Sequence, residues 1–236
     1  MPTTIILSPS KEMNLSAGSQ KVDLSPNTYE LYQCIQSLSI ENLKKTLKLS
    51  EEKAIEVHSY YKKLTDPIAK PAIQTYQGIA YRQIDLNKLN LNYVQHHLWI
   101  LSAFYGPIRP LDAISPYRLD FQSNLKINNQ SLKKFWSKIY TETLQAYTVI
   151  NLASNEFSSV IHSNVCDVWN VEFYQDLNHR KKAPSATAKK LRGALTHHLL
   201  YHENFNLQTF KSFEFEGYQF IHYDSINKEY IYQKKQ

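Results

Sequence analysis

Short apolar runs and segments of helical periodicity alternate along this chain. Residues 4–7 form a largely apolar run that stops at Ser8-Pro9. Because proline cannot donate to a β-ladder, this run predicts a short buried strand that ends there. Other segments predict strands in the same way: 148–154, 165–174 and a C-terminal hairpin of 218–223 and 229–232.

Residues 39–64 predict a hairpin of two helices. Apolar residues from Ile40 to Leu47 recur at the i, i+3 and i+7 spacing of one helical face, and Ser39 is the N-cap. Ser50 caps the second helix after a tight turn. Buried strands interleaved with helices indicate a mixed α/β or α+β fold, and without repeats or linkers we expect one domain, residues 1–236. Further helices are predicted at 132–146 and 188–199.

The composition is that of a folded protein, with 42% apolar and 20% charged residues among 236. Only 5 glycines occur, and neither G-x-G-x-x-G nor G-x-x-x-x-G-K-[ST] is present, which excludes the common phosphate loops. Cys34 and Cys166 form no C-x-x-C pair and suit a reducing compartment. There is no signal-peptide pattern, and the uncharged stretch 89–108 predicts a buried element rather than a membrane span, so we expect a cytoplasmic protein.

The charge balance favours polyanionic partners. Lysine and arginine outnumber aspartate and glutamate by 27 to 21, which gives a net charge of +6 and an isoelectric point near 9.1. The 17 tyrosines are unusual. They either stack on nucleic-acid bases or fill the interior with rings that carry a polar tip, and the second use is commoner.

A proline-rich segment at 101–120 carries the densest candidate chemistry. Its prolines stiffen the connection, and it presents two guanidinium groups, Arg109 and Arg118, that could clamp a phosphate in bidentate fashion. Asp112 and Asp120 lie close by in the sequence, so each arginine could instead pair with its neighbouring aspartate and brace the loop. Spacing alone favours bracing.

Polar residues follow two of the predicted strands. Ligand groups gather beyond the carboxyl ends of strands in open α/β sheets, which makes these residues binding candidates, although serine and asparagine are also ordinary turn residues. Ser8 lacks the G-x-S-x-G elbow and has no assignable general base, so we do not interpret it as a nucleophile. The residues are Ser8 and Lys11 after the first strand, and Asn151, Ser154 and Glu156 at the end of the second.

The histidines do not predict a metal site. His198 and His202 lie four residues apart and would share one face of a continued helix, but the pattern is not H-E-x-x-H or another recognised one. We therefore expect core or solvated histidines, no metal ligands and no cofactor, and direct iron binding is the weakest alternative.

Lysines surround the predicted helical hairpin. In helix-hairpin-helix modules, backbone amides at the hairpin and at the next helix N-terminus, here at Ser50, bind a DNA phosphate. The turn lacks the glycine that such hairpins usually carry, and Glu51 and Glu52 repel a phosphate. Taken alone, the segment therefore favours a structural hairpin. The lysines are Lys44, Lys45, Lys48 and Lys53.

Several motifs, in order along the chain, resemble one protein family. Residues 7–11 resemble I-S-P-A-K, and 101–120 match L-S-x-x-Y-G-x-x-R-P-x-D-x-x-x-P-Y-R-L-[ED] almost without gaps. The other motifs are the aromatic–glycine–tyrosine segment 76–81, V-I-N-L-A-S-x-E at 149–156, K-K-x-R-G at 189–193 and E-G-Y-x-F at 216–220. Together they make the chain similar to the YaaA family, the bacterial peroxide stress proteins.

This resemblance implies a cytosolic protein that limits free intracellular iron during peroxide stress and so protects DNA and proteins from hydroxyl radicals. It implies a single mixed α/β fold of the cantaloupe type, with a helix-hairpin-helix element at residues 39–64 and a positively charged cleft for double-stranded DNA. No established reaction comes with it. His197 stands where relatives tend to carry arginine, which implies that some cleft charge depends on pH. The cleft residues that it implies are Lys11, Tyr81, Arg109, Arg118, Lys189 and Arg192.

We interpret the chain as a DNA-binding peroxide stress protein without a membrane or an obligate protein partner, whose cleft also suits a small anionic ligand. The alternative is an enzyme that acts on a DNA base, a nucleotide or a phosphorylated metabolite, with Lys11 or Glu156 as acid or base. The cleft candidates are Ser8, Lys11, Tyr81, Arg109, Arg118, Asn151, Glu156, Lys189 and Arg192, and the DNA-binding candidates are Lys44, Lys45, Lys48, Ser50 and Lys53.

Overall fold

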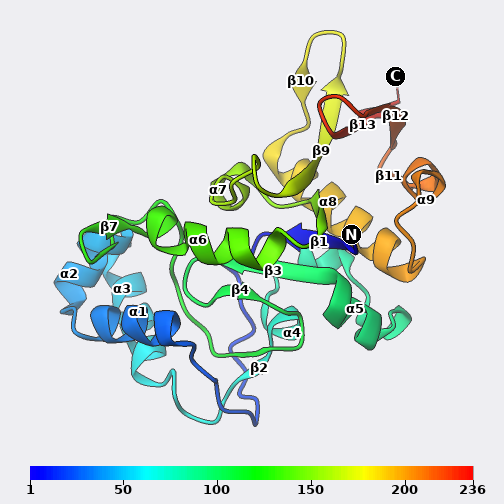
Figure 1. The fold of residues 1–236 in the computed structure, drawn as a ribbon. Coiled ribbons are helices and arrows are strands. Elements are labelled where there is room, and N and C mark those ends of the chain that lie inside the picture. The colour runs from blue at the N-terminus through cyan, green and yellow to red at the C-terminus, as the bar shows by residue number, and fades with distance from the viewer. Residues whose placement is uncertain (236) are drawn as a thin grey trace.

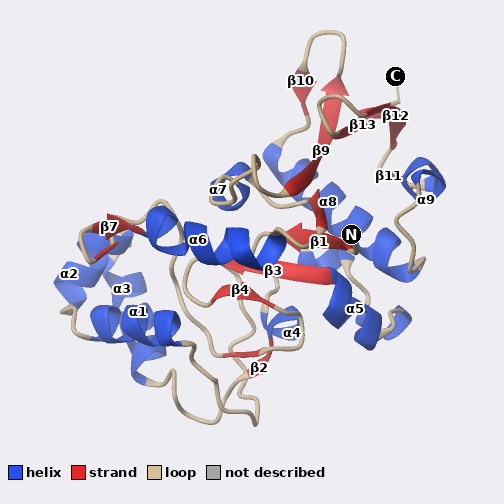
Figure 2. Ribbon diagram, in the orientation of Figure 1, coloured by secondary structure: helices blue, strands red, loops and turns tan. Residues whose placement is uncertain are grey.

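The computed structural model describes residues 1–235, and a nine-stranded mixed sheet runs through it (Figures 1 and 2). The centre of the sheet is parallel, and both of its ends are antiparallel. In order, the parallel strands are β3 (Leu98–Ser102), β1 (Thr3–Leu7), β8 (Thr148–Asn151), β9 (Asp167–Asp176) and β13 (Glu229–Lys234). The antiparallel strands are β4 (Gly106–Ile108) beside β3, and β12 (Tyr218–Asp224), β11 (Glu214–Phe215) and β10 (Lys181–Lys182) toward the other end.

Helices and short strands surround this sheet. In Figure 1 the first three helices gather at the left of the molecule, and α6 packs against β4. The helices are α1 (Pro26–Gln36), α2 (Ile40–Leu47), α3 (Glu51–Lys62), α4 (Ala72–Thr75), η1 (Tyr81–Gln83), η2 (Leu86–Lys88), α5 (Leu91–His97), α6 (Leu132–Leu144), α7 (Asn155–Ser158), α8 (Ser185–Tyr201) and α9 (Leu207–Ser212). The short strand pairs are β2 (Lys70–Pro71) with β5 (Ala113–Ile114), and β6 (Lys126–Ile127) with β7 (Gln130–Ser131).

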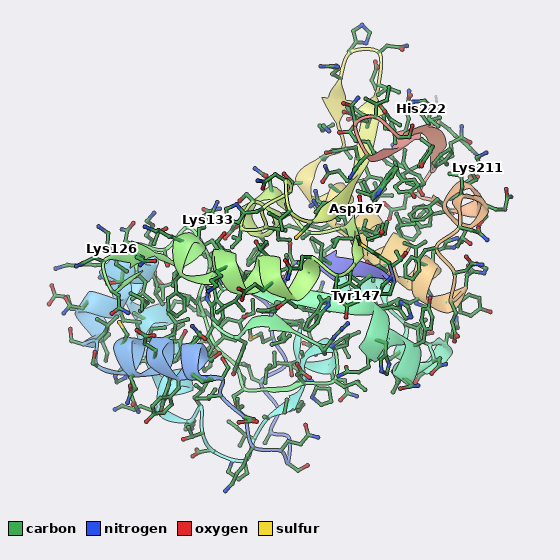
Figure 3. The ribbon with its side chains drawn as sticks, viewed as in Figure 1. Lys126, Lys133, Tyr147, Asp167, Lys211 and His222 are labelled. Atoms are coloured by element: carbon green, nitrogen blue, oxygen red, sulfur yellow. The ribbon has the colours of Figure 1, made fainter. Side chains whose placement is uncertain are left out.

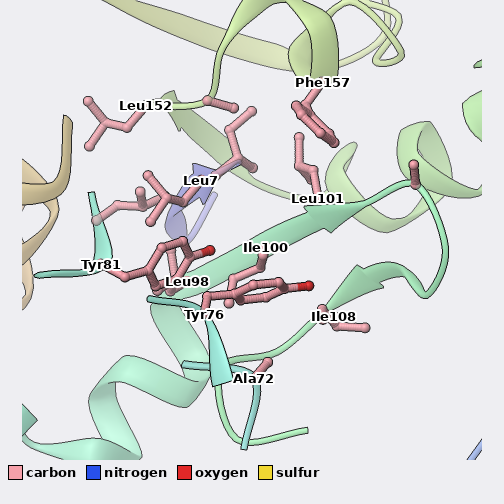
Figure 4. Close-up of a cluster of buried hydrophobic side chains, with 14 of the residues drawn as sticks. Leu7, Ala72, Tyr76, Tyr81, Leu98, Ile100, Leu101, Ile108, Leu152 and Phe157 are labelled. Carbon is pink, nitrogen blue, oxygen red and sulfur yellow. The ribbon is translucent and has the colours of Figure 1, made fainter. Parts of the chain in front are cut away.

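Strand β1 forms as predicted and lies inside the sheet, between β3 and β8. Ile5 and Ile6 are fully buried and Leu7 is almost so, which shows that both faces of the strand are covered, as is usual for a central parallel strand. Figure 4 shows Leu7 with Leu152, which follows β8, and Phe157 of α7. Burial of each such side chain contributes about 1.5–3 kcal/mol, so this junction of strand ends is firmly held.

Tyrosine and serine hydroxyl groups inside the core bond to one another. The Oγ of Ser102 accepts hydrogen bonds from the backbone N–H groups of Phe104, at 3.2 Å, and Tyr105, at 2.9 Å. The hydroxyl of Tyr117 lies 2.8 Å from this Oγ and 2.9 Å from the hydroxyl of Tyr76. Burial raises the pKa of Tyr117 to about 12, so its hydroxyl stays protonated at neutral pH. These tyrosines fill the interior, the commoner of the two uses considered for them.

The predicted helical hairpin is confirmed as α2 and α3. The Oγ atoms of Ser39 and Ser50 accept hydrogen bonds from the N–H groups of Asn42, at 3.2 Å, and Lys53, at 3.3 Å. These N-caps satisfy donors that the first helical turn leaves free. Lys48 ends α2 with φ of 55°, in the left-handed region that glycine usually occupies at this position. The tight turn therefore forms without a glycine.

Two segments differ from the sequence expectation. Residues 89–108 are not one buried element but α5, β3 and β4 in succession, because Asn90 within the run caps a helix. Helix α1 was not predicted, although Ser25 caps it through the N–H of Thr28, at 3.2 Å, and Pro26 opens it. Among residues 1–235, none of the helices combines the length and apolarity needed to cross a bilayer.

Candidate anion-binding cavity

A cavity of about 350 Å³ lies where β1 and β8 end, the position at which open α/β sheets commonly bind ligands. Sequence-distant segments meet there, because β1 and β8 are neighbours in the sheet although they lie far apart in the chain. The wall is formed by residues 7–13, 78–81 and 117–120, by Leu152, Ser154, Glu156 and Phe157, and by Lys189 and Arg192 of α8. Predicted cleft residues that line it are Ser8, Lys11, Tyr81, Arg118, Glu156, Lys189 and Arg192.

Ser8 joins the ends of the two strands. Its Oγ accepts a hydrogen bond from the N–H of Ser154, at 2.8 Å, and donates to the Oγ of Ser154, at 3.2 Å. The hydroxyl of Tyr81 donates to the backbone oxygen of Ser8, at 2.9 Å. These bonds use the Ser8 hydroxyl to hold the cavity floor, and its contacts include no histidine or carboxylate that would act as a base.

Three of the four cations in the cavity wall have no carboxylate partner in the part of the chain that the structure describes. Within residues 1–235, Arg118, Lys189 and Arg192 make no ion pair, because the carboxylates around the cavity bond elsewhere. Burial lowers the pKa of Arg192, against the opposing effect of the Glu172 carboxylate, and a guanidinium stays charged at neutral pH even so. The cavity therefore presents positive charge that the protein itself does not neutralise.

The acidic residues at the cavity have their own partners. Asp120 pairs with Lys11 at 3.0 Å and not with Arg118, so the predicted brace between Arg118 and Asp120 is wrong. The carboxylate of Glu156 accepts hydrogen bonds from the N–H of Phe121, at 3.2 Å, and the side-chain amide of Gln122, at 3.1 Å. Glu156 is thus the one acidic lining group that no cation pairs with among the described residues, against three unpaired cations.

Two glycines bring the cavity walls together. A Cβ on Gly193 of α8 would lie only 2.0 Å from the backbone oxygen of Ala80, so α8 packs directly onto the segment 78–81. A Cβ on Gly78 would lie 2.2 Å from the Oγ of Ser10 in the opposite wall. Both glycines belong to motifs that carry the family resemblance, and at Gly193 the close approach of the Ala80 backbone is the physical reason that the position needs glycine.

Arg109 does not line the cavity, contrary to expectation. Its guanidinium lies 3.5 Å from the ring centre of Trp99 and donates to the hydroxyl of Tyr147, at 3.1 Å, and to the backbone oxygen of His96, at 2.9 Å. Its own N–H donates to Asp112, at 2.7 Å. The predicted ion pair between Arg109 and Asp112 is therefore wrong: Asp112 bonds the backbone of residue 109, while the guanidinium packs on Trp99 and bonds Tyr147, which is labelled in Figure 3.

Two other expectations are corrected in the same way. Asn151 lies outside the cavity wall because its amide donates to Asn170, at 2.8 Å, and its Oδ1 accepts from the N–H of Ala153, at 3.0 Å. His197 also lies outside the wall, so it does not add charge to the cavity lining, and burial lowers its pKa.

The hairpin lysines lie apart from the cavity wall, and three of them pair with glutamates of the hairpin. The exception is Lys48, whose ammonium donates to the backbone oxygen of Gln122, at 3.0 Å. A second bond joins the same two segments, from the N–H of Asn124 to the backbone oxygen of Thr46, at 2.9 Å. Since Gln122 also bonds Glu156, the hairpin is attached to the cavity rim. The pairs are Lys44–Glu51 at 3.4 Å, Lys45–Glu41 at 2.7 Å and Lys53–Glu56 at 2.7 Å.

The histidines of α8 make local contacts. The Nε2 of His198 lies 3.0 Å from the backbone oxygen of Thr209, and its ring centre is 4.5 Å from that of His202. No cluster of three or more histidine, cysteine, aspartate or glutamate side chains in the described part of the chain is placed to hold a metal ion.

Known proteins resemble this chain over all the segments that form the cavity wall. Residues 3–223 match the family described as peroxide stress protein YaaA. UPF0246 proteins of Streptococcus gordonii and Clostridioides difficile are each 31% identical to this chain over 98% of it, covering 98% and 99% of their own lengths. A UPF0246 protein of Francisella philomiragia is 30% identical over 92% of this chain and 94% of its own. Because the match includes every segment of the cavity wall, from β1 to α8, the chain belongs to the family of the peroxide stress protein YaaA.

Proposed function

We propose that this protein binds double-stranded DNA and that its cavity holds one phosphate-bearing nucleotide. The proposal rests on the meeting of Arg118, Lys189 and Arg192 at one cavity, each without an ion pair within residues 1–235. Such cations are available to a phosphate, and guanidinium groups bind it with two parallel hydrogen bonds. A volume of about 350 Å³ suits a group of nucleotide size rather than a stretch of duplex.

The apolar part of the cavity wall supports the same ligand class. Leu119, Leu152 and Phe157 line the cavity together with the cations. A nucleotide combines an anionic phosphate with a flat base whose faces are apolar, so it matches both parts of the wall. A simple inorganic anion would leave the apolar wall without a partner.

The helical hairpin supplies a second contact to the duplex, as a helix-hairpin-helix element. Its attachment to the cavity rim through Lys48 and Gln122 supports one continuous binding surface. The glutamates that pair with its other lysines do not prevent this, because exposed ion pairs are worth only about 0–1 kcal/mol and can exchange for phosphate. In this proposal, residues 1–236 act as one domain of the cantaloupe type.

Alanine at both Lys45 and Lys48 should weaken duplex binding equally for all sequences and lower the slope of log affinity against log salt by about two, one for each lost phosphate contact. The matched control is alanine at Lys211, on α9 in Figure 3, and Lys234, which removes the same charge elsewhere. Filter binding across a salt series measures both slopes. An unchanged slope for the hairpin variant would remove the hairpin from the interface.

The membership in a peroxide stress family supports the wider role: the protein limits free iron in the cell and so protects DNA and proteins from hydroxyl radicals. Free iron, measured by electron paramagnetic resonance in peroxide-treated cells with and without the protein, tests this role. Equal iron signals in the two strains would contradict it.

The enzymatic alternative keeps one specific observation in its favour. Lys11 and Glu156 face the same cavity as the three cations, where a bound nucleotide would meet an acid or base. A product released from DNA or nucleotides, lost on Lys11→Ala but kept in the hairpin variant, would establish catalysis. If no product forms after long incubation, the enzymatic alternative is contradicted and the cavity only binds its ligand.

A further inference from the structure

A basic two-stranded arm projects from the body of the protein. Strand β9 continues past its neighbours, turns at residues 177–180 and returns as β10, and Figure 1 shows this ribbon extending beyond the rest of the fold. Residues 178–182 are all exposed. The turn is ordered: the N–H of Arg180 bonds to Leu177 at 3.0 Å, and Asp176 accepts from the N–H of His179 at 3.2 Å.

The tip of this arm carries free positive charge. Arg180 and Lys181 make no ion pair with any group between residues 1 and 235. Their neighbours are occupied, because His179 contacts Asp176 at 2.7 Å and Lys182 pairs with Glu172 and lies 4.3 Å from the ring centre of Tyr174. The two unpaired cations therefore stand at the outermost part of the ribbon, available to a polyanion.

The base of the arm adjoins the cavity. Ala183 is buried and its N–H bonds to the backbone oxygen of Phe173, at 2.9 Å, so the return strand is fixed to the sheet. Pro184 then leads directly into α8, which carries Lys189 and Arg192. Glu172, which holds Lys182 of the arm, also lies close enough to Arg192 to act on its charge.

We propose that this β9–β10 arm enters the major groove of the duplex whose nucleotide occupies the cavity, with Arg180 and Lys181 on phosphates at the groove edge. The inference rests on the proposed DNA binding and adds a third contact to it. Beyond its last pairing with β13, at Tyr174, strand β9 runs to Asp176, about 7 Å at ~3.3 Å per residue, and the turn at 177–180 extends past that. The major groove is about 12 Å wide and about 8.5 Å deep and admits a two-stranded ribbon, so the turn fits between the phosphate rows with Arg180 and Lys181 at the level of the phosphates.

The test compares two arm variants with the intact protein. One is Arg180→Ala with Lys181→Ala, and the other replaces residues 177–180 with an Asn-Gly turn, which closes a two-residue hairpin on the pair Asp176 and Lys181. We expect the double variant to lower the salt slope of duplex binding by about two, and the shortened arm to bind duplex at least tenfold more weakly. Both should bind a deoxynucleoside monophosphate at the cavity as the intact protein does. Alanine at Lys134 and Lys138 of α6 is the charge-matched control.

The outcomes separate the two proposals. If the intact protein binds duplex and both arm variants bind it with unchanged slope and affinity, the arm is not in the interface, and the cavity proposal stands. If the arm variants also lose the mononucleotide, the arm acts on the fold of the cavity, and the groove contact is overturned. If the intact protein binds no duplex, the proposed function fails and the arm contact fails with it.

Discussion

Replacing both Arg118 and Arg192 with alanine is expected to lower the affinity for a deoxynucleoside monophosphate, and for duplex DNA, by at least about 100-fold. Each hydrogen bond to a charged group contributes about 1.5–3 kcal/mol, and ~1.4 kcal/mol corresponds to a tenfold change in affinity. Both side chains line the cavity without an ion pair, so their loss leaves no buried carboxylate unpaired and the fold should remain intact.

Isothermal titration calorimetry with the mononucleotide measures this effect, and thermal unfolding checks the fold. The double alanine variant of Arg180 and Lys181 is the matched control, because it removes the same charge outside the cavity wall. Mononucleotide binding that survives the loss of both cavity arginines would contradict the proposed site. An equal loss in the arm variant would show that general charge, rather than this cavity, attracts the ligand.

The second large effect is expected from Gly193→Val, which should destabilise the protein by about 3 kcal/mol or more. The new Cβ would lie 2.0 Å from the backbone oxygen of Ala80, and backbone cannot rotate away as a flexible side chain can. Helix α8 must therefore shift from the segment 78–81, and overpacking of this kind costs typically about 1–3 kcal/mol and occasionally more. The shift also separates Arg192 from the opposite cavity wall.

Urea unfolding measures the loss of stability. Ala186→Val on the exposed first turn of the same helix is the control, since it introduces the same side chain where only helix propensity changes, a cost of about 0.5 kcal/mol. Equal unfolding midpoints for Gly193→Val and the control would show that α8 does not need this close approach.

Local signals predicted the local structure well. Ser39 and Ser50 cap helices where expected, and the apolar run at 4–7 is a strand, because caps and short apolar runs act through residues adjacent in sequence. Ser25 and Pro26 are a comparable start signal for helix α1. Strand β10 has no such signal, since two residues cannot show a period.

Contacts with distant parts of the chain determine where the long side chains of the candidate site lie. Arg109 and Arg118 occupy the same rigid segment, yet one lies on Trp99 and the other faces the cavity. The sequence does not show which surface a long side chain meets, because that depends on strands that pair from distant parts of the chain. The expectation that ligand groups lie beyond the carboxyl ends of strands did identify Ser8 and Glu156 at the cavity. It succeeded because it depends only on where a strand ends and not on which residue a side chain contacts.

The position of β1 between β3 and β8 has a consequence for folding during translation. At the end of this strand the hydroxyl of Ser8 bonds to Ser154, which lies 146 residues further along the chain. Helix α8, which completes the cavity wall, comes later still in the sequence. During translation β1 leaves the ribosome before β3 and β8, the strands that it pairs with, have been made. Such non-local pairing is slow, and until it forms the apolar surface of β1 is exposed. The binding pocket is therefore among the last features to assemble, so a nascent chain that stalls before α8 has no ligand affinity to stabilise it and is open to proteases.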